Sequence, residues 1–229
     1  MGIIDFTATK CKHCYKCVRY CDVKAIMIKD ERAEIMQDKC ILCGHCLQIC
    51  PQEAKTLNSD LHQVQTMIRC GEKVIVSIAP SYMGLLKYKT IGQVKNALKR
   101  LGFFDVRETS EGAAVVTEEY ARLLKEGTME NIITTCCPSV NSLIEIYYPQ
   151  LVPFMAPVVS PMIAHGMMIK KQHPDARVVF LGPCIAKKQE SEDARHRNAI
   201  DAVLNFNDIN QWLEEEHVVI EECDDEPFV

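Results

Sequence analysis

Eight of the 13 cysteines fall within the first fifty residues, in two runs of identical spacing. Each run reads C-x2-C-x2-C-x3-C, and the second repeats the first 29 positions later. In iron–sulfur proteins this spacing lets three thiolates wrap one cubane while the fourth cysteine reaches the cluster of the other run. The runs therefore predict two [4Fe-4S] clusters with crossed ligand sets. One set is Cys11, Cys14, Cys17 and Cys50, and the other is Cys40, Cys43, Cys46 and Cys21.

Two alternatives to iron–sulfur clusters are zinc and disulfide bonds. Zinc sites usually pair two C-x2-C knuckles without a third cysteine in register, and they often recruit histidine. His13 and His45 lie inside the runs, but we interpret them as solvated loop residues. A secreted disulfide scaffold would begin with a signal peptide, and this N-terminus has neither a basic start nor a long apolar stretch. We therefore expect a cytoplasmic protein whose clustered cysteines bind iron.

The bulk composition is that of an ordinary globular protein, with 48% apolar and 25% charged residues among 229. The net charge of −5 argues against a nucleic-acid partner, because phosphate contact favours a basic surface. No apolar run approaches the roughly 20 residues that a membrane-spanning helix needs. We thus expect neither a nucleic-acid partner nor a membrane partner.

The cysteine repeat also indicates the domain organisation. An alanine follows each run at the same distance, as Ala25 and Ala54, so each unit is expected to be a cysteine loop, a short helix and a short strand. Residues 1–57 would then form a small α+β dicluster ferredoxin-like domain. Residues 58–72 are expected to be a helical connector, and residues 73–229 an α/β domain that is incomplete at its C-terminus.

The second domain alternates apolar, β-branched segments with amphipathic ones, which favours a mainly parallel sheet covered by helices on both faces. Strands are predicted at residues 73–80, 103–109, 132–137 and 177–184, and helices near 92–102, 118–127, 139–151, 162–172 and 209–216. Chemistry in such sheets collects beyond the carboxyl ends of the strands. The predicted ends carry Ala79-Pro80-Ser81, Cys136-Cys137-Pro138 and Pro183-Cys184.

Taken in order, these segments resemble the large subunit of the [FeFe]-hydrogenase family. The resemblance rests on the two cysteine runs, IAPS at 78–81, TTCCP at 134–138, SP at 160–161 and PCIAKKQE at 183–190. It extends from about residue 5 to the end of the chain. In that family an H-cluster, a cubane joined to a two-iron unit with CO and cyanide ligands, sits at these strand ends.

The resemblance implies roles for individual residues. Cys137 and Cys184 match two of the four thiolate ligands of the H-cluster cubane, and Cys136 matches the thiol that passes protons to the two-iron unit. Lys187 matches the lysine that holds a cyanide ligand, and Glu190 belongs to the inner end of the proton path. This is physically reasonable, since a buried ammonium donates well to an anion and a thiol can exchange protons near neutral pH. The residues implied to line the pocket are Ala79, Pro80, Ser81 and Ser160.

The chain also departs from the family pattern. The family's last motif supplies two further cysteines, whereas Cys223 stands alone in an acidic stretch, where we expect a loosely packed thiol. Gly182 replaces the methionine of catalytic members, and Ala156 replaces a relay serine. Near Glu119, which matches a relay acid, Arg122 falls where a second acid is expected. These departures resemble the sensory branch of the family, and the chain looks truncated.

The expected function is one-electron transfer by a dicluster domain fused to a hydrogenase-like domain. Hydrogen oxidation, hydrogen evolution or hydrogen sensing is implied by the resemblance, with an H-cluster or a third [4Fe-4S] cluster only in a complete parent protein. We expect no hydrogen turnover by this chain alone, and a redox protein or the missing C-terminal segment as partner. Two alternatives stay open: a pure ferredoxin-type module whose α/β domain is structural or docks a partner, and an iron–sulfur cluster assembly factor.

Overall fold

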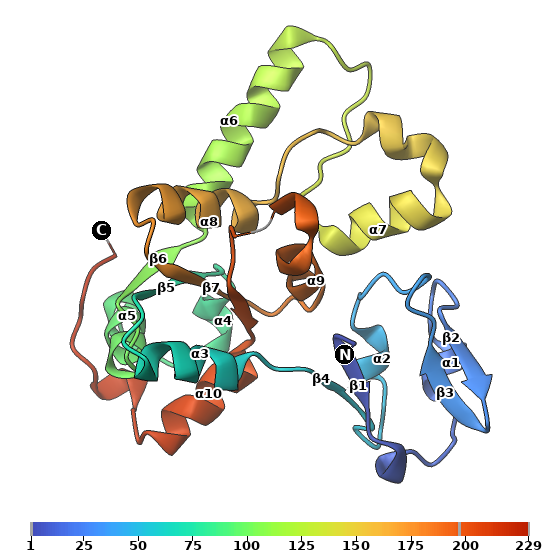
Figure 1. Cartoon of the computed structure of the whole chain (residues 1–229), viewed down its shortest axis with the longest axis horizontal. Helices are drawn as coiled ribbons and strands as arrows, with labels where there is room; N and C mark the ends of the chain where they lie inside the picture. Colours follow the sequence, from blue (N-terminus) through green and yellow to red (C-terminus); the bar gives the residue numbers. More distant parts are fainter. Residues whose placement is uncertain (1, 197, 229) are drawn as a thin grey trace.

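The computed structural model describes residues 2–196 and 198–228. Figure 1 shows a small N-terminal part, coloured blue, joined by one connecting segment to a larger unit built on a sheet. Helix α6 (Ser110–Glu126) projects from that unit and packs against α8 (Pro161–Gln172), and α7 (Pro138–Tyr147) contacts α9 (Ala186–Glu192). The predicted class is confirmed: a ferredoxin-like part with small antiparallel sheets precedes an α/β domain with a parallel sheet.

Two antiparallel strand pairs frame the N-terminal part. Its elements are β1 (Ile4–Phe6), a 3₁₀ turn (Ala8–Lys10), α1 (Lys16–Arg19), β2 (Ile26–Lys29), β3 (Arg32–Ile35), α2 (His45–Gln48) and β4 (Lys55–Leu57). β1 pairs with β4 and so joins the two ends of this part, while β2 and β3 form a hairpin. Asp30 and Glu31 at the hairpin turn have φ of 46° and 61°, as the two central residues of a type I′ turn require.

The internal repeat is visible in the backbone itself. Left-handed residues recur at the same 29-residue interval, in the pairs His13 and Leu42, Tyr15 and Gly44, and Lys24 and Glu53. A left-handed conformation costs a non-glycine residue roughly 1 kcal/mol, so its recurrence needs a reason. Alternating left- and right-handed residues turn successive N–H groups toward one point, the geometry of many iron–sulfur loops. Both cysteine loops therefore curl around a centre.

Four parallel strands form the sheet of the larger unit. They are β5 (Val74–Ile78), β6 (Asp105–Glu108), β7 (Arg177–Leu181) and β8 (Ala202–Leu204), in the order β6-β5-β7-β8 (Figure 1). β5 and β7 pair along five residues, from Val74 opposite Arg177 to Ile78 opposite Leu181. The carboxyl ends of the two central strands therefore lie side by side.

Helices cover both faces of the sheet, as predicted. On β5, Val74, Val76 and Ile78 face one core, which α5 (Ile91–Arg100) and α10 (Phe206–Glu215) complete. Ile75 faces the opposite core, with α8 (Pro161–Gln172). The near-continuous apolar run of each central strand follows from burial on both faces. Within the described residues, no helix is long and apolar enough to cross a membrane.

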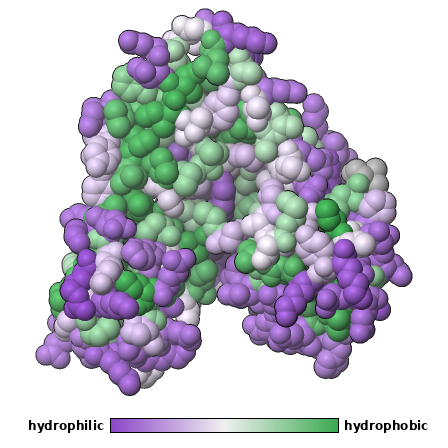
Figure 2. Space-filling view, turned by 180° about the vertical axis from the view of Figure 1, so that it is seen from behind, coloured by the Kyte–Doolittle hydropathy of each residue, from purple (hydrophilic) through white to green (hydrophobic). Residues whose placement is uncertain are grey.

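The remaining helices connect the sheet to its surroundings. They are α3 (Leu61–Arg69), α4 (Tyr82–Leu85), α6 (Ser110–Glu126), α7 (Pro138–Tyr147) and α9 (Ala186–Glu192), with 3₁₀ segments at Pro149–Phe154, Ala194–His196 and Ile220–Glu222. The connector was predicted as helical and contains α3. Exposed apolar side chains occur on α6, on α7 and on the 3₁₀ segment after it, among them Leu124, Val140 and Val152. Figure 2 shows apolar surface gathered in the upper part of the molecule, away from its two lower lobes.

Residues 132–137, predicted as the third strand, do not join the sheet. β-branched residues favour the extended backbone that this segment adopts, but it has one isolated bridge, from Ile133 to Met155. The N–H of Thr135 donates to the hydroxyl of Tyr120 at 2.8 Å instead of to a neighbouring strand. Cys136-Cys137-Pro138 therefore follow a loop, not a strand of the sheet. The fourth strand is β8, which the sequence analysis missed.

The acidic C-terminal segment packs against α5, so the expectation of a loosely packed Cys223 was wrong. Cys223 is 6% exposed, and its carbonyl accepts the side-chain amide of Gln93 at 3.1 Å. Arg100 points a guanidinium N–H at its sulfur, 3.5 Å away. Lys99 pairs with Glu226 at 2.7 Å. The basic side chains of α5 thus attract the acidic ones that follow α10.

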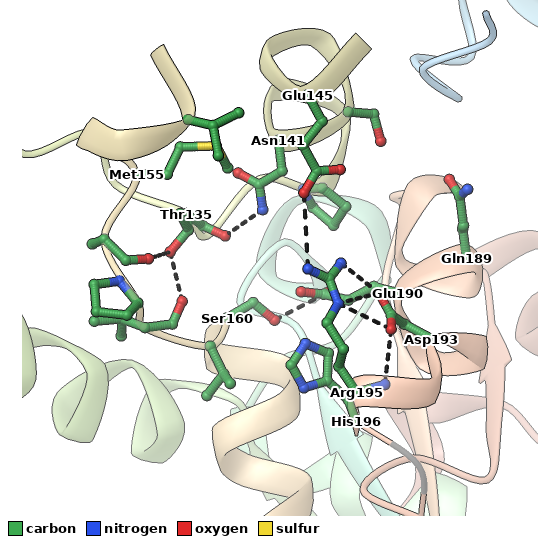
Figure 3. A pocket seen from close by; sticks show the side chains of 17 residues that line it. Thr135, Asn141, Glu145, Met155, Ser160, Gln189, Glu190, Asp193, Arg195 and His196 are labelled. Atoms are coloured by element: carbon green, nitrogen blue, oxygen red, sulfur yellow. Dashed lines mark hydrogen bonds and ion pairs between the residues drawn. The ribbon is translucent and has the colours of Figure 1, made fainter. Parts of the chain in front are cut away.

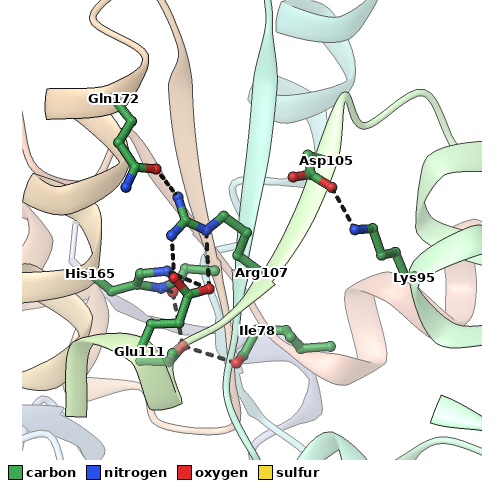
Figure 4. Close-up of polar contacts among 9 residues, drawn as sticks. Ile78, Lys95, Asp105, Arg107, Glu111, His165 and Gln172 are labelled. Carbon is green, nitrogen blue, oxygen red and sulfur yellow. Dashed lines mark hydrogen bonds and ion pairs between the residues drawn. The ribbon is translucent and has the colours of Figure 1, made fainter. Parts of the chain in front are cut away.

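A buried polar cluster lies between the sheet and α8 (Figure 4). Ser77 Oγ is 2.8 Å from both Thr109 Oγ1 and Nδ1 of the fully buried His165. His165 Nε2 faces Glu111 at 3.6 Å, and Arg107 holds that carboxylate through two N–H groups. Burial lowers the pKa of His165 to about 4, so the ring is neutral at neutral pH. This cluster supports β5 just before the strand reaches the hydrogenase-like residues.

Candidate functional site

The first cysteine group lies at α1. Cys11 and Cys14 stand in the left-handed loop before the helix, and Cys17 stands within it. Burial raises the pKa of the Cys17 thiol, and the nearby thiols of Cys50 and Cys14 add to the rise. Cys50 comes from the far end of the second run, and its sulfur accepts the N–H of Ala54 at 3.3 Å. The thiol of Cys50, which belongs to the second run, therefore lies near that of Cys17.

The second cysteine group lies at α2 in a matching arrangement. Cys40 and Cys43 precede the helix and Cys46 stands within it. Burial raises the pKa of Cys40, and the nearby thiols of Cys43 and Cys21 add to the rise. The sulfur of Cys21 accepts the N–H of Ala25 at 3.2 Å, as in the other group. In this group the additional cysteine, Cys21, comes from the first run.

The second group fits a cubane. All four of its thiols border one small enclosed pocket, whose other walls include Ile4, Ala25, Ile26, Ile35 and Ile41. Four convergent thiols, an apolar wall and an N–H donor to sulfur are what holds and tunes a [4Fe-4S] cluster. Among the described residues, no three His, Cys, Asp or Glu side chains converge closely enough to hold a single metal ion. A cluster bound here would supply reversible one-electron transfer.

Lys55 is a candidate that the sequence analysis missed. It begins β4 and is 5% exposed, with Nζ 3.5 Å from the carbonyl oxygen of Ala33 and 4.7 Å from the centre of the Phe6 ring. Burial raises the pKa of Cys17, and that of Cys46 to about 11, and the charge of Lys55 opposes both rises. The available signal was a lysine where the internal repeat has an apolar residue.

The hydrogenase-like residues gather where β5 and β7 end, next to the second cysteine group. Cys184 follows β7 and packs in the same apolar cluster as Leu42 and Cys46 of the N-terminal part. Gly182 lies against Ala79 at the end of β5, where an added Cβ would stand 3.1 Å from the alanine side chain. Pro80 is exposed beside them. The adjoining Ser81 has a buried hydroxyl with no hydrogen-bond partner among the described residues.

Lys187, Glu190 and Ser160 form one polar chain. Lys187 is 9% exposed and donates to the carbonyl oxygen of Cys136 at 3.2 Å and to Glu190 at 2.7 Å. Glu190 also accepts the hydroxyl of Ser160 at 3.0 Å. The carboxylate thus balances a buried ammonium and joins α9 to α8. The Cys136 residue itself is exposed.

A polar pocket of about 430 Å³ opens beside this chain (Figure 3). Ser160 and Glu190 lie on its wall, together with Asn141, whose side-chain oxygen is buried without a partner among the described residues. Arg195 lies between two carboxylates at its edge. The cavity is not lined by Cys137 or the other predicted thiols, so the structure separates part of the predicted site from it.

The strand ends offer too few thiols for a complete H-cluster. Two residues are matched to cubane ligands: Cys137, which directly precedes α7, and Cys184, which follows β7. The other described cysteines outside the N-terminal part are Cys136, the exposed Cys70 after α3 and the buried Cys223 at α5. A cubane held by protein alone takes four thiolates. The described residues therefore do not complete that cluster.

The outer acid of the implied proton path is engaged by arginine. Arg122 donates to Glu119 at 2.9 Å and also pairs with Glu126. Hydrogen bonding from Arg122 lowers the pKa of Glu119. A carboxylate held ionised in this way is poorly suited to receiving a proton.

Polar ties hold the N-terminal part against the hydrogenase-like unit. The hydroxyl of Tyr147 in α7 contacts the carbonyl oxygens of Val23 and Lys39 at 3.0 and 2.8 Å. Lys188 in α9 pairs with Asp60 at 2.7 Å, ahead of α3. The sequence analysis singled out neither residue for this role. Both ties lie next to the strand ends that carry Cys137 and Cys184.

Two stretches of the chain match described families. Residues 10–54 match a 4Fe-4S dicluster domain, and residues 72–229 match the C-terminal domain of the iron-only hydrogenase large subunit. Iron hydrogenase 1 of Clostridium pasteurianum is 26% identical, over 86% of this chain and 46% of that protein. The NADP-reducing hydrogenase subunit HndD of Solidesulfovibrio fructosivorans is 24% identical, over 79% of this chain and 38% of that protein.

Solved structures agree at the level of the fold. One [FeFe]-hydrogenase superposes with a TM-score of 0.64 at 23% identity, over 75% of this chain and 51% of that one. The [FeFe]-hydrogenase of Chlamydomonas reinhardtii gives 0.61 at 21% identity. The chain spans about half the length of these proteins or less. With its dicluster part followed by a partial C-terminal domain that fills most of its length, the chain belongs to the [FeFe]-hydrogenase large-subunit family.

Proposed function

We propose that this chain is an electron-transfer protein in which two [4Fe-4S] clusters pass single electrons to or from the strand-end site of its hydrogenase-like domain. The observation that carries the proposal is the apolar cluster shared by Cys40, Cys46 and Cys184. It sets the second cysteine group directly against the end of β7. The cluster of the first group, around Cys17, would then be the one farther from the hydrogenase-like domain along the electron-transfer path.

The interface suits this role because polar contacts hold it in place at two points. The hydroxyl of Tyr147 binds carbonyl groups close to Cys21 and Cys40 in the sequence. Lys188 is ion-paired to Asp60, and the two side chains are 11% and 18% exposed, respectively. Half-buried polar ties of this kind hold two surfaces in one register. Efficient electron transfer requires a constant distance between the redox sites.

The proposal is tested on anaerobically reconstituted protein. Iron and acid-labile sulfide are measured per chain, and the reduced form is examined by EPR. About eight irons in two coupled cubanes would support it, and about twelve would add a third cluster at the strand ends. Iron well below eight in the intact chain, or bound zinc, would contradict it. Cys21→Ser and Cys50→Ser each remove a ligand of a different proposed set, so each should disturb mainly one cluster signal. Cys70→Ser, an exposed cysteine outside both groups, is the matched control.

A sensory role for the parent protein, in preference to rapid hydrogen turnover, is our second proposal. It is supported by the pairing of Arg122 with Glu119 and Glu126. This pairing keeps Glu119, the outer acid of the implied proton path, bound to an arginine. The partner would be a redox protein or the rest of the C-terminal domain. Replacing Cys137 and Cys184 tests whether the α/β domain takes part at all. Unchanged iron content and spectra would favour a purely structural or docking domain.

A further inference from the structure

Four lysines of the described chain are buried, and three of them have a carboxylate partner. Lys95, Lys187 and Lys188 pair at 3.1, 2.7 and 2.7 Å with Asp105, Glu190 and Asp60, respectively. Lys55 is the most buried of the four, at 5% exposure, and no described carboxylate lies within 4.0 Å of its ammonium. Burying an ammonium without a counter-charge is unfavourable, so a structural reason for this one is needed.

The direct contacts of Lys55 are too weak to balance its charge. Its ammonium lies 3.5 Å from the carbonyl oxygen of Ala33, at the limit of a hydrogen bond, and 4.7 Å from the centre of the Phe6 ring. Both contacts are with neutral groups. Neither contact supplies the negative charge that would balance the ammonium.

Thiols that bind a cluster carry negative charge, and the start of β4 is close in the fold to both cysteine groups. β4 begins immediately after Ala54, whose N–H binds the sulfur of Cys50, and it packs against α2, the helix of Cys46. Cys50 belongs to the first ligand set and Cys46 to the second. Lys55 therefore follows a backbone contact to one set and begins a strand that packs against the helix of the other.

The internal repeat shows that the fold does not require a lysine here. Position 55 corresponds to Ile26 in the first repeat, since both follow the alanine that binds the last cysteine of a run. Ile26 is 6% exposed and purely apolar. An isoleucine therefore fits the equivalent place in a nearly identical backbone, which leaves the charge as the property that distinguishes Lys55.

We propose that Lys55 is a shared tuning residue, a single buried cation that raises the reduction potentials of both clusters. The inference rests on the proposed function, because it needs two bound clusters. Each reduction adds one negative charge to a cluster, and a fixed positive charge nearby stabilises the reduced form. Because the cation lies close to both groups, its removal should lower both potentials in the same direction.

The test is an EPR-monitored redox titration of the full chain as wild type, Lys55→Ile and Lys55→Arg. Isoleucine installs the residue of the first repeat, and arginine keeps the charge. Lys29→Met is the matched control, because it removes a lysine of the same part whose side chain is 61% exposed and therefore screened by water. Iron is counted for every protein, so that failure to bind clusters is distinguished from unchanged potentials.

We expect Lys55→Ile to keep about eight irons and to lose electron affinity at both clusters on the order of tenfold, which is ~59 mV per cluster. Lys55→Arg and Lys29→Met should stay close to wild type. If Lys55→Ile loses iron while Lys55→Arg keeps it, the charge is needed to bind the clusters and not to set their potentials, and the inference is overturned. Unchanged potentials in a fully loaded Lys55→Ile protein would overturn it, as would loss of iron in both variants. Wild-type protein without clusters would instead refute the proposed function.

Discussion

Acidification tests the buried polar cluster around His165. The ring is fully buried against Ser77, and burial lowers its pKa to about 4, whereas an unfolded histidine titrates near 6.5. Between these two pKa values the histidine is protonated in the unfolded chain and neutral in the folded chain. Stability is therefore complete above about pH 6.5, falls as the pH drops through this window, and levels off below about pH 4.

The size of this effect follows from the two pKa values. Each unit of pH inside the window removes about 1.4 kcal/mol, so the full loss attributable to His165 is about 3 kcal/mol. By about pH 5.5 roughly 1.4 kcal/mol has been lost, which is measurable without reaching strongly acidic conditions. His165→Gln keeps a polar side chain beside Ser77 but does not titrate. The variant should be less stable than wild type near neutral pH, and that difference should shrink as the pH falls.

Urea unfolding followed by the fluorescence of Trp212 is the appropriate assay. This tryptophan is the only one in the chain, is 4% exposed and lies 5.5 Å from the Phe103 ring, so it reports on the sheet-containing unit. His62→Gln, at an exposed position on α3, controls for the loss of a histidine as such. If the free-energy difference between wild type and His165→Gln stayed constant from about pH 7.5 to about pH 5.5, His165 would not be held neutral by burial.

Two further changes probe packing and the interface. Gly112→Ala should destabilise the chain by about 2–4 kcal/mol in the same urea assay, because a Cβ there would stand 2.3 Å from the carbonyl oxygen of Pro161. Gly84→Ala is the control, and it should change stability little because the space around Gly84 is open. Lys188→Met should cost about 3 kcal/mol by leaving Asp60 half-buried without its partner, and the double variant with Asp60→Asn should recover part of that loss. Equal effects of the two glycine changes, or additive effects of the two interface changes, would contradict the packing described.

Local and periodic features of the chain were predictable from sequence. The cysteine runs repeat at a fixed interval, and the backbone repeats with them down to left-handed residues such as His13 and Leu42. The central strands were also found, because β5 and β7 are buried on both faces and so read as continuous apolar runs. Helix α5, which comes after β5 in the chain, was predicted from the spacing of Val94, Leu98 and Leu101.

Features decided by distant contacts were not predictable. Residues 132–137 have the composition of a strand, yet Thr135 pairs with the hydroxyl of Tyr120 and the segment never reaches the sheet. β8 is three residues long, too short for its alternation to be recognised. The acidic end looks solvated until it is placed beside the basic residues of α5, such as Lys99.

The candidate site divides in the same way. The cysteine groups follow from spacing, but the charge of Lys55 gains its meaning only from its burial at the start of β4, next to both groups. Tyr147 likewise gives no sign in the sequence that its hydroxyl will reach Val23 and Lys39. Tyr147 acts across more than a hundred positions of chain, a separation that no local pattern records.

The order of strands has a consequence for how the protein is made. β7, the central partner of β5, leaves the ribosome about a hundred residues after it, several seconds later at roughly 5–20 residues per second. The apolar cluster that shields the second cysteine group also includes Cys184 and Ala186, which are synthesised later still. During translation the thiols of Cys40 and Cys46 therefore lack the part of their apolar cover that Cys184 and Ala186 provide. Oxygen reaches these sulfurs more readily in that interval than in the finished fold.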